Sequence, residues 1–314
     1  MKKVSISILA LQEKYGDKEA LRIAKEIGAD AVDFSLYSGH GRFDCQNADS
    51  IYAKSEQEFI AYFTDLRRYA ESIGLDICMT HGRLDGLRNI PGKDEALYEN
   101  ARLDCYATAL LGSPVCVVHG VTTIYHMDTP PEMMREMNFQ MFCRMIPYAK
   151  QYGIKIATET FGDVDGCSTC DFFGNIDEFI ATYERICAVE DNRDYFTVCV
   201  DTGHSNKATK FNNNPKPPQV IRMLGNRVTC LHLNDNNTVT DQHLIPFVAK
   251  AGYQIEGTID WDDVFATLED IGYNGYYNME LELARYGEEI MPETARFAII
   301  VLKNALEKRE RLLK

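Results

Sequence analysis

At residues 152–159 the chain reads Tyr152-Gly153-Ile154-Lys155-Ile156-Ala157-Thr158-Glu159, and this pattern indicates the repeating unit of the structure. A stretch with helical periodicity comes before it, and the glycine can end that helix because it readily adopts the left-handed conformation. The short apolar run that follows is typical of a strand buried on both faces. The run ends in a polar residue, Glu159. The segment therefore predicts a helix, a turn and a buried strand with a polar end.

The same unit recurs along the whole chain. Each copy has a turn with glycine and then a short apolar or β-branched run, and the copies lie at residues 31–34, 76–79, 115–118, 228–231 and 275–278. Two further strand-like runs, at residues 4–9 and 196–200, bring the number of predicted strands to eight, each followed by a plausible helix. Strict alternation of strands and helices predicts an α/β protein with a parallel sheet and right-handed crossovers.

Polar residues at the strand ends distinguish a closed barrel from an open sheet. The third to the eighth strand end, 31 to 48 residues apart, in His81, His119, Glu159, Asp201, His232 and Glu280. In a barrel these ends meet at one mouth, whereas in an open sheet they would lie along a line. One such histidine or carboxylate is usually structural, but six at successive strand ends indicate a metal site. We therefore predict a single (β/α)8 TIM barrel over residues 1–314, with a C-terminal helix at residues 292–313.

The alternation of side chains along a strand predicts which cysteines face the barrel interior. Cys199 and Cys230 lie two residues before a strand-end ligand, so they should point to the same side as that ligand. Cys78 and Cys116 lie three residues before one, so they should face the surrounding helices.

The composition limits the class of protein and its partners. The 314 residues are 45% hydrophobic and 25% charged, as in ordinary globular proteins, and the formal net charge is −14. This charge would repel a polyanion, so we do not expect nucleic acid as a partner. Ten cysteines in a long chain without an export signal or a membrane-spanning run predict reduced thiols and a cytoplasmic location. The sequence is compatible with a homo-oligomer.

Five segments resemble the xylose-isomerase-like barrels, which include ketose 3-epimerases, inositol-catabolism enzymes and endonuclease IV. The segments are Ala157-Thr158-Glu159-Thr160, Val200-Asp201-Thr202-Gly203-His204, Leu231-His232-Leu233-Asn234-Asp235, Gly257-Thr258-Ile259-Asp260-Trp261 and Gly272-Tyr273-Asn274-Gly275-Tyr276-Tyr277-Asn278-Met279-Glu280. The likeness covers nearly the whole chain. The D-x-x-H element followed later by G-x-I-D-W is its most specific part.

The resemblance implies a metal-dependent enzyme that acts on a small sugar, polyol or inosose. In the epimerase-like members, one divalent ion is held by residues that match Glu159, Asp201, His232 and Glu280. Three carboxylates and one imidazole suit Mn²⁺, Zn²⁺, Mg²⁺ or Co²⁺. The implied reaction is isomerisation or epimerisation through a metal-stabilised enediolate, with Glu159 and Glu280 transferring the proton. His204 would contact a substrate oxygen.

The resemblance also leaves two other functions open. Endonuclease IV holds three zinc ions on nine ligands, and its further ligands match His81, His119, His204, Asp241 and His243. The ion count therefore lies between one and three, and His81 and His119 bind either an ion or a substrate hydroxyl. The alternative function is a multi-zinc phosphodiesterase acting on abasic DNA, and a weaker one is an inosose-type dehydratase. Ketose epimerases tend to keep an arginine shortly after the residue that matches His232, and residues 236–242 contain none. The aromatic candidates for a sugar platform are Tyr37, Tyr125, Phe161 and Trp261.

Overall fold

The computed structural model describes residues 2–37, 41–164, 168–211, 214–248 and 258–312. In this part of the chain, eight parallel strands form the central sheet, in the order β10-β1-β2-β3-β4-β5-β8-β9. Their bounds are β1 Val4–Ser7, β2 Ala31–Ser35, β3 Asp76–His81, β4 Val115–Val118, β5 Lys155–Glu159, β8 Phe196–Asp201, β9 Val228–His232 and β10 Tyr277–Met279.

The two ends of this sheet meet, which closes it into a barrel. A parallel bridge joins Leu233, just after β9, to Met279 of β10. The Leu233 amide donates to the carbonyl of Asn278 at 2.8 Å, and the Glu280 amide donates to the carbonyl of Leu233 at 3.3 Å. The predicted α/β barrel is therefore confirmed. The predicted run at residues 4–9 is longer than β1, because helix α1 begins at Leu9, and the predicted run at residues 275–278 begins two residues before β10, which starts at Tyr277.

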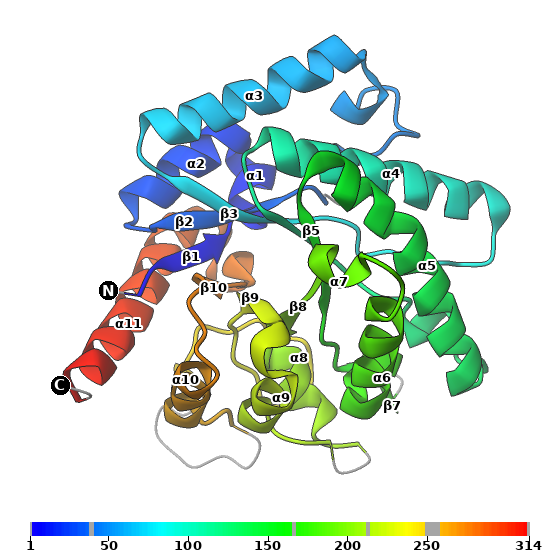
Figure 1. Ribbon diagram of the computed structural model, residues 1–314. Helices are drawn as coiled ribbons and strands as arrows, with labels where there is room; N and C mark the ends of the chain where they lie inside the picture. Colours follow the sequence, from blue (N-terminus) through cyan, green and yellow to red (C-terminus); the bar gives the residue numbers. More distant parts are fainter. Residues whose placement is uncertain (1, 38–40, 165–167, 212–213, 249–257, 313–314) are drawn as a thin grey trace.

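Helices surround the strands, and Figure 1 shows them arranged around the ring. The α-helices are α1 Leu9–Tyr15, α2 Asp17–Glu26, α3 Glu56–Ser72, α4 Pro91–Leu110, α5 Pro131–Tyr152, α6 Ile176–Cys187, α7 Asn192–Tyr195, α8 Thr202–Ala208, α9 Pro217–Leu224, α10 Trp261–Asp270 and α11 Met291–Leu312. Short 3-10 helices are η1 Ile51–Ala53, η2 Thr123–Tyr125, η3 Phe172–Gly174, η4 Gly225–Arg227, η6 Leu283–Tyr286 and η7 Glu288–Ile290. No helix among the described residues has the length and apolarity needed to span a bilayer.

The ends of the helices follow the predicted turn chemistry. Helix α5 ends at Gly153, whose φ of 70° is left-handed, so the glycine in the decisive segment has the role that the sequence predicts for it. A small antiparallel pair, β6 Asp163–Val164 and β7 Thr169–Cys170, lies in the connection after β5. Helix α8 begins directly after β8, with Asp201 as its N-cap, because the Asp201 carboxylate accepts a hydrogen bond from the His204 amide at 2.5 Å.

The barrel interior confirms three of the four cysteine predictions. Cys199 and Cys230 belong to the small apolar cluster inside the ring, and Cys116 belongs to the core between strands and helices. The prediction for Cys78 is wrong, because Cys78 also lies in the interior cluster. Pairing between β2 and β3 passes from Val32–Ile77 directly to Asp33–Met79. Cys78 is therefore the extra residue of a β-bulge, which interrupts the alternation of side chains.

Candidate metal centre

Four side chains from four strand ends meet at the barrel mouth. Glu159, Asp201 and His232 end β5, β8 and β9, and Glu280 follows β10. Each offers a ligand atom, and these four atoms all lie within 4.8 Å of one another. The first three residues are fully buried, whereas the Glu280 side chain is 20% exposed. Residues up to 121 positions apart in the chain therefore form one compact group with a single side open to the mouth.

The imidazole of His232 lies between the two glutamates. Its Nδ1 atom is 3.1 Å from Glu159 Oε1 and 3.2 Å from Glu280 Oε2. The carboxylate of Asp201 is oriented by Asn234, whose side-chain amide donates a hydrogen bond to Asp201 Oδ2 at 2.6 Å. Asn234 is not among the residues that the sequence predicts, and it orients a carboxylate toward the centre as the outer partners of metal ligands do.

The buried polar atoms of this centre fit a divalent cation. Both carboxylate oxygens of Glu159 and both ring nitrogens of His232 are buried, and none has a hydrogen-bond partner among the described residues. Burying three carboxylates together is costly unless positive charge balances them, which a bound cation can provide. Three carboxylates and one imidazole match the ligand preferences of Mn²⁺, Mg²⁺, Co²⁺ and Zn²⁺. Glu159, Asp201, His232 and Glu280 can therefore hold such an ion.

Charges within the centre lower the pKa values of its glutamates and raise those of its histidines. Burial alone would raise the pKa of Glu159 and of Glu280, but neighbouring histidines hold both pKa values well below their usual range. Burial alone would lower the pKa of His232 and of His243. Nearby acidic groups instead raise the pKa of His232 well above its usual value and that of His243 to about 9. When no ion is bound, the surrounding acidic groups therefore favour the protonated form of both imidazoles.

The protein without its ion should lose stability as the pH rises. Histidine pKa values raised in the folded state stabilise it fully below the unfolded value of about 6.5, and this contribution is lost as the pH rises through about 9. We expect the melting temperature of chelator-treated protein to fall between about pH 6.5 and pH 9.5 and the metal-loaded protein to show a smaller fall, because the ion replaces the protons. Calorimetry at a series of pH values measures both. Equal falls for the two forms would contradict this charge assignment.

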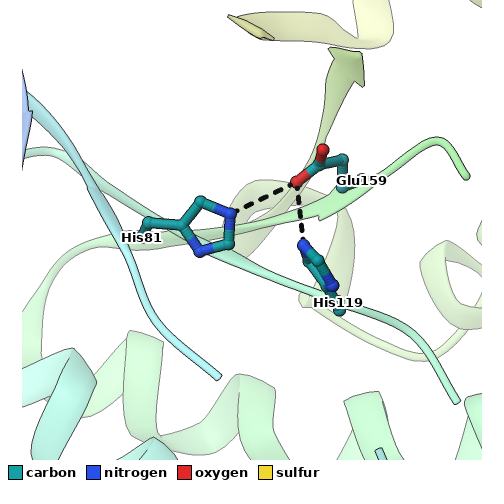
Figure 2. Close-up of side chains that lie close together, drawn as sticks. All are labelled: His81, His119 and Glu159. Carbon is teal, nitrogen blue, oxygen red and sulfur yellow. Dashed lines mark ion pairs between the residues drawn. The ribbon is translucent and has the colours of Figure 1, made fainter. Parts of the chain in front are cut away.

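Two further histidines approach the same glutamate from neighbouring strands. His81 Nε2 lies 3.5 Å from Glu159 Oε2 and 3.6 Å from Glu280 Oε1, and His119 Nε2 lies 3.2 Å from Glu159 Oε2. Figure 2 shows both rings pointing at the Glu159 carboxylate. The ring of Phe161 packs against His119, with centroids 5.0 Å apart. His81 and His119 thus flank the four-residue group and can bind substrate oxygens or an ion.

A second group of potential ligands lies on the other side of Asp201. Asp201, His204 and His243 offer ligand atoms within 4.8 Å of one another. Asp241 contacts both histidines: its Oδ2 atom is 3.2 Å from His204 Nε2, and its Oδ1 atom is 3.7 Å from His243 Nδ1. All nine residues that the sequence predicts for the site therefore lie at one mouth of the barrel.

One buried acid of the centre is missing from the sequence prediction. Asp33 of β2 is fully buried, and its Oδ2 atom lies 3.3 Å from His232 Nε2. Because Nδ1 of the same ring faces the glutamates, Asp33 can fix the orientation of the imidazole. The signal in the sequence is an acid in the middle of an apolar strand, Ala31-Val32-Asp33-Phe34, which would be costly without a partner.

Replacing Asp33 by asparagine should weaken metal binding about 10- to 100-fold, because the ring of His232 loses its charged partner. Titration with Mn²⁺ or Zn²⁺ under a competing chelator measures this change. The control is Asp49→Asn, which removes the same charge from an exposed position and should leave the affinity unchanged. Equal affinities for Asp33→Asn and wild type would remove Asp33 from the centre.

Two of the four aromatic candidates for a sugar platform, Phe161 and Trp261, have different surroundings. Phe161 contacts His119 and His204 at the site. Trp261 is only 1% exposed, packs on Phe265 and donates its indole N–H to Asp235 at 3.1 Å. The platform interpretation is therefore wrong for Trp261, which belongs to the core. Gly257 of the same segment lies outside the described residues.

Comparisons with known proteins agree with this architecture. A family described as "Xylose isomerase-like TIM barrel" matches residues 21–301. The uncharacterized protein y4fM of Sinorhizobium fredii is 24% identical over 180 residues, which cover 57% of this chain and 50% of that protein. This chain spans about half the length of the curated relatives it matches.

Solved structures give the same fold over the whole chain. A D-tagatose 3-epimerase-like protein superimposes with a TM-score of 0.71 at 20% identity and 100% coverage of both chains. The IolI protein with a bound zinc atom superimposes with a TM-score of 0.66 at 16% identity, covering 96% of this chain and 97% of that one. At such identities the likeness shows the fold. Since the family match covers most of the residues, this protein belongs to the xylose isomerase-like TIM barrel family.

Proposed function

We propose that this protein is a divalent-metal-dependent isomerase or epimerase of a small sugar, polyol or inosose. The observation that carries the proposal is the convergence of Glu159, Asp201, His232 and Glu280 within 4.8 Å at the open end of the barrel. The similar folds of a D-tagatose 3-epimerase-like protein and of zinc-bound IolI support it. The substrate would lie at the mouth, against Phe161 and the flanking histidines.

The two glutamates would carry the proton. Glu159 and Glu280 come from different strands and lie 3.1 and 3.2 Å from His232 Nδ1, and the reacting carbon of the substrate would lie within reach of both carboxylates. One carboxylate would take the proton from the carbon next to the carbonyl, and the C–H electron pair would form the double bond of an enediolate. In an epimerisation the other carboxylate, protonated from solvent beforehand, would give its proton to the opposite face of that carbon, and the first carboxylate would then release the proton it took to solvent. A bound divalent ion would supply positive charge that favours the enediolate.

The histidines and the buried walls would position the substrate. His81 and His119 point their Nε2 atoms at Glu159, where they can exchange hydrogen bonds with substrate hydroxyls. Phe161 offers a ring face beside His119 and His204. Because the four central residues are almost completely buried, a bound sugar would leave little bulk water at the reacting carbon, and the two carboxylates would exchange protons with solvent between turnovers.

The test is hydrogen exchange from solvent. The protein, loaded in turn with Mn²⁺, Mg²⁺, Co²⁺ or Zn²⁺, is incubated in D₂O with a panel of ketoses and inososes and followed by NMR. Deuterium should enter the carbon next to the carbonyl of at least one compound, and a chelator should stop this exchange. Absence of exchange across the panel, together with cleavage of DNA, would refute the proposal.

A multi-zinc phosphodiesterase is the second candidate, and the group Asp201, His204 and His243 favours it, because neighbouring metal ions suit phosphate ester hydrolysis. The formal charge of −14 acts against DNA binding. An oligonucleotide with an abasic site, incubated with the same metal-loaded samples, tests this candidate. An inosose-type dehydratase would be recognised in the NMR assay by a product that has lost water.

A further inference from the structure

A buried lysine lies beside the metal centre and takes no part in the proposed proton transfer. Lys207 is on α8, one turn after His204, and is 1% exposed. Its Nζ atom lies 2.9 Å from Asp163 Oδ1 and 3.8 Å from Asp241 Oδ1. An ammonium group is stable in such a place only when anionic groups surround it. The two carboxylates therefore favour a positively charged Lys207 on this side of the mouth.

Asp241 connects this charge to the second group of potential ligands. The Asp241 Oδ2 atom is 3.2 Å from His204 Nε2, while its Oδ1 atom faces Lys207. His204 Nδ1 lies 3.2 Å from the carbonyl oxygen of Thr160, which leaves Nε2 as the atom that faces Asp241. An ion bound by Asp201, His204 and His243 would sit next to Asp241 and hence close to the ammonium of Lys207.

We propose that Lys207 limits the centre to one divalent ion. This inference rests on the proposed function, in which that ion is held by Glu159, Asp201, His232 and Glu280. Two positive charges that both lie beside the carboxylate of Asp241 in a poorly hydrated site repel each other. Lys207 also contacts Asp241, the carboxylate that lies beside His204 and His243 and that would help to balance a second cation. The ammonium group thus supplies the positive charge that a second ion would otherwise supply. With a single ion, the site stays suited to a neutral sugar.

The test is the number of ions bound per chain. Wild-type protein and the Lys207→Met variant are dialysed against Zn²⁺ and, separately, Mn²⁺, and their metal content is measured. Wild type should bind one ion. The variant should bind a second ion at least about 100-fold more tightly than wild type does. Adding Asp241→Asn to the variant should remove this second ion.

Two matched variants separate the local charge from a general loss of positive charge. Lys210→Met also removes a partner of Asp163, since Lys210 Nζ lies 2.6 Å from Asp163 Oδ2, but the Lys210 side chain is 34% exposed. This variant should bind one ion. Lys207→Arg keeps the charge and should also bind one ion.

A folded Lys207→Met variant that binds one ion, like wild type, would overturn the role of Lys207 and leave the proposed function intact. A wild type that binds no ion would overturn both. If Lys207→Met does not fold, Mn²⁺ titration of wild type followed by electron paramagnetic resonance decides. A second Mn²⁺ spin-coupled to the first would refute the inference, and uncoupled binding of a single Mn²⁺ would support it.

Discussion

Replacing Glu280 by glutamine should lower kcat by about 1,000-fold while leaving the fold intact, because a positioned acid or base contributes about 10²- to 10⁴-fold to proton transfer. Glu280 is the most accessible of the four central residues, with a 20% exposed side chain, so it faces an incoming substrate. Its carboxylate is also 3.2 Å from His232 Nδ1 and 3.3 Å from His243 Nε2. The amide keeps the volume of the side chain but accepts no proton at neutral pH.

The measurement is kcat at saturating metal and substrate, with circular dichroism as a check of folding. Glu282→Gln is the matched control, because Glu282 is exposed and lies two residues away, and its variant should keep wild-type kcat. Glu159→Gln should be as inactive as Glu280→Gln, since the two carboxylates share the proton transfer. Near-normal kcat in either of these variants would remove that glutamate from the mechanism.

Replacing His232 by glutamine should abolish specific metal binding and, with it, the stabilisation that the ion provides. Ligand binding at about 1,000 times the dissociation constant stabilises a folded protein by about 4 kcal/mol. For a chain of this size we expect wild type to melt roughly 5–10 °C lower after removal of the ion. The His232→Gln variant should melt at the same temperature with and without metal, because His232 provides the only imidazole ligand among the four central residues.

His126 provides the control for this substitution. His126 is also a buried histidine, 9% exposed, but its Nε2 atom contacts the carbonyl of Leu87 at 2.7 Å, outside the centre. His126→Gln should therefore keep the full metal-dependent shift, even if its melting temperature is lower. A metal-dependent shift that persists in His232→Gln would show that the ion binds elsewhere.

The sequence predicts the barrel well because its signals are local. A glycine that ends a helix, such as Gly153, acts within a few residues of itself. The polar ends of six successive strands could be named for the same reason, since each follows its own apolar run. Closure of the ring then brings the carboxyl ends of parallel strands to one mouth, so His81 and Glu280 meet although 199 residues separate them.

The sequence does not predict contacts that depend on how one strand is aligned with another. Cys78 faces the interior because the pairing of β2 and β3 skips one residue, and a bulge leaves no local mark in the apolar pattern. Asp33 contacts His232 across the barrel, between strands that are not neighbours in the sheet. Neither contact follows from spacing along the chain.

Short-range periodicity and the convergence of parallel strand ends were enough to predict the barrel and the six polar residues at its strand ends, whereas His204, Asp241 and His243 were predicted only from the family resemblance. Only the tertiary structure decided which of these residues share an ion-sized space, how Asp33 and Asn234 orient them, and that Lys207 lies between Asp163 and Asp241. These relations arise from side chains that meet through the closure of the ring, and the distances between them are set by packing rather than by sequence separation.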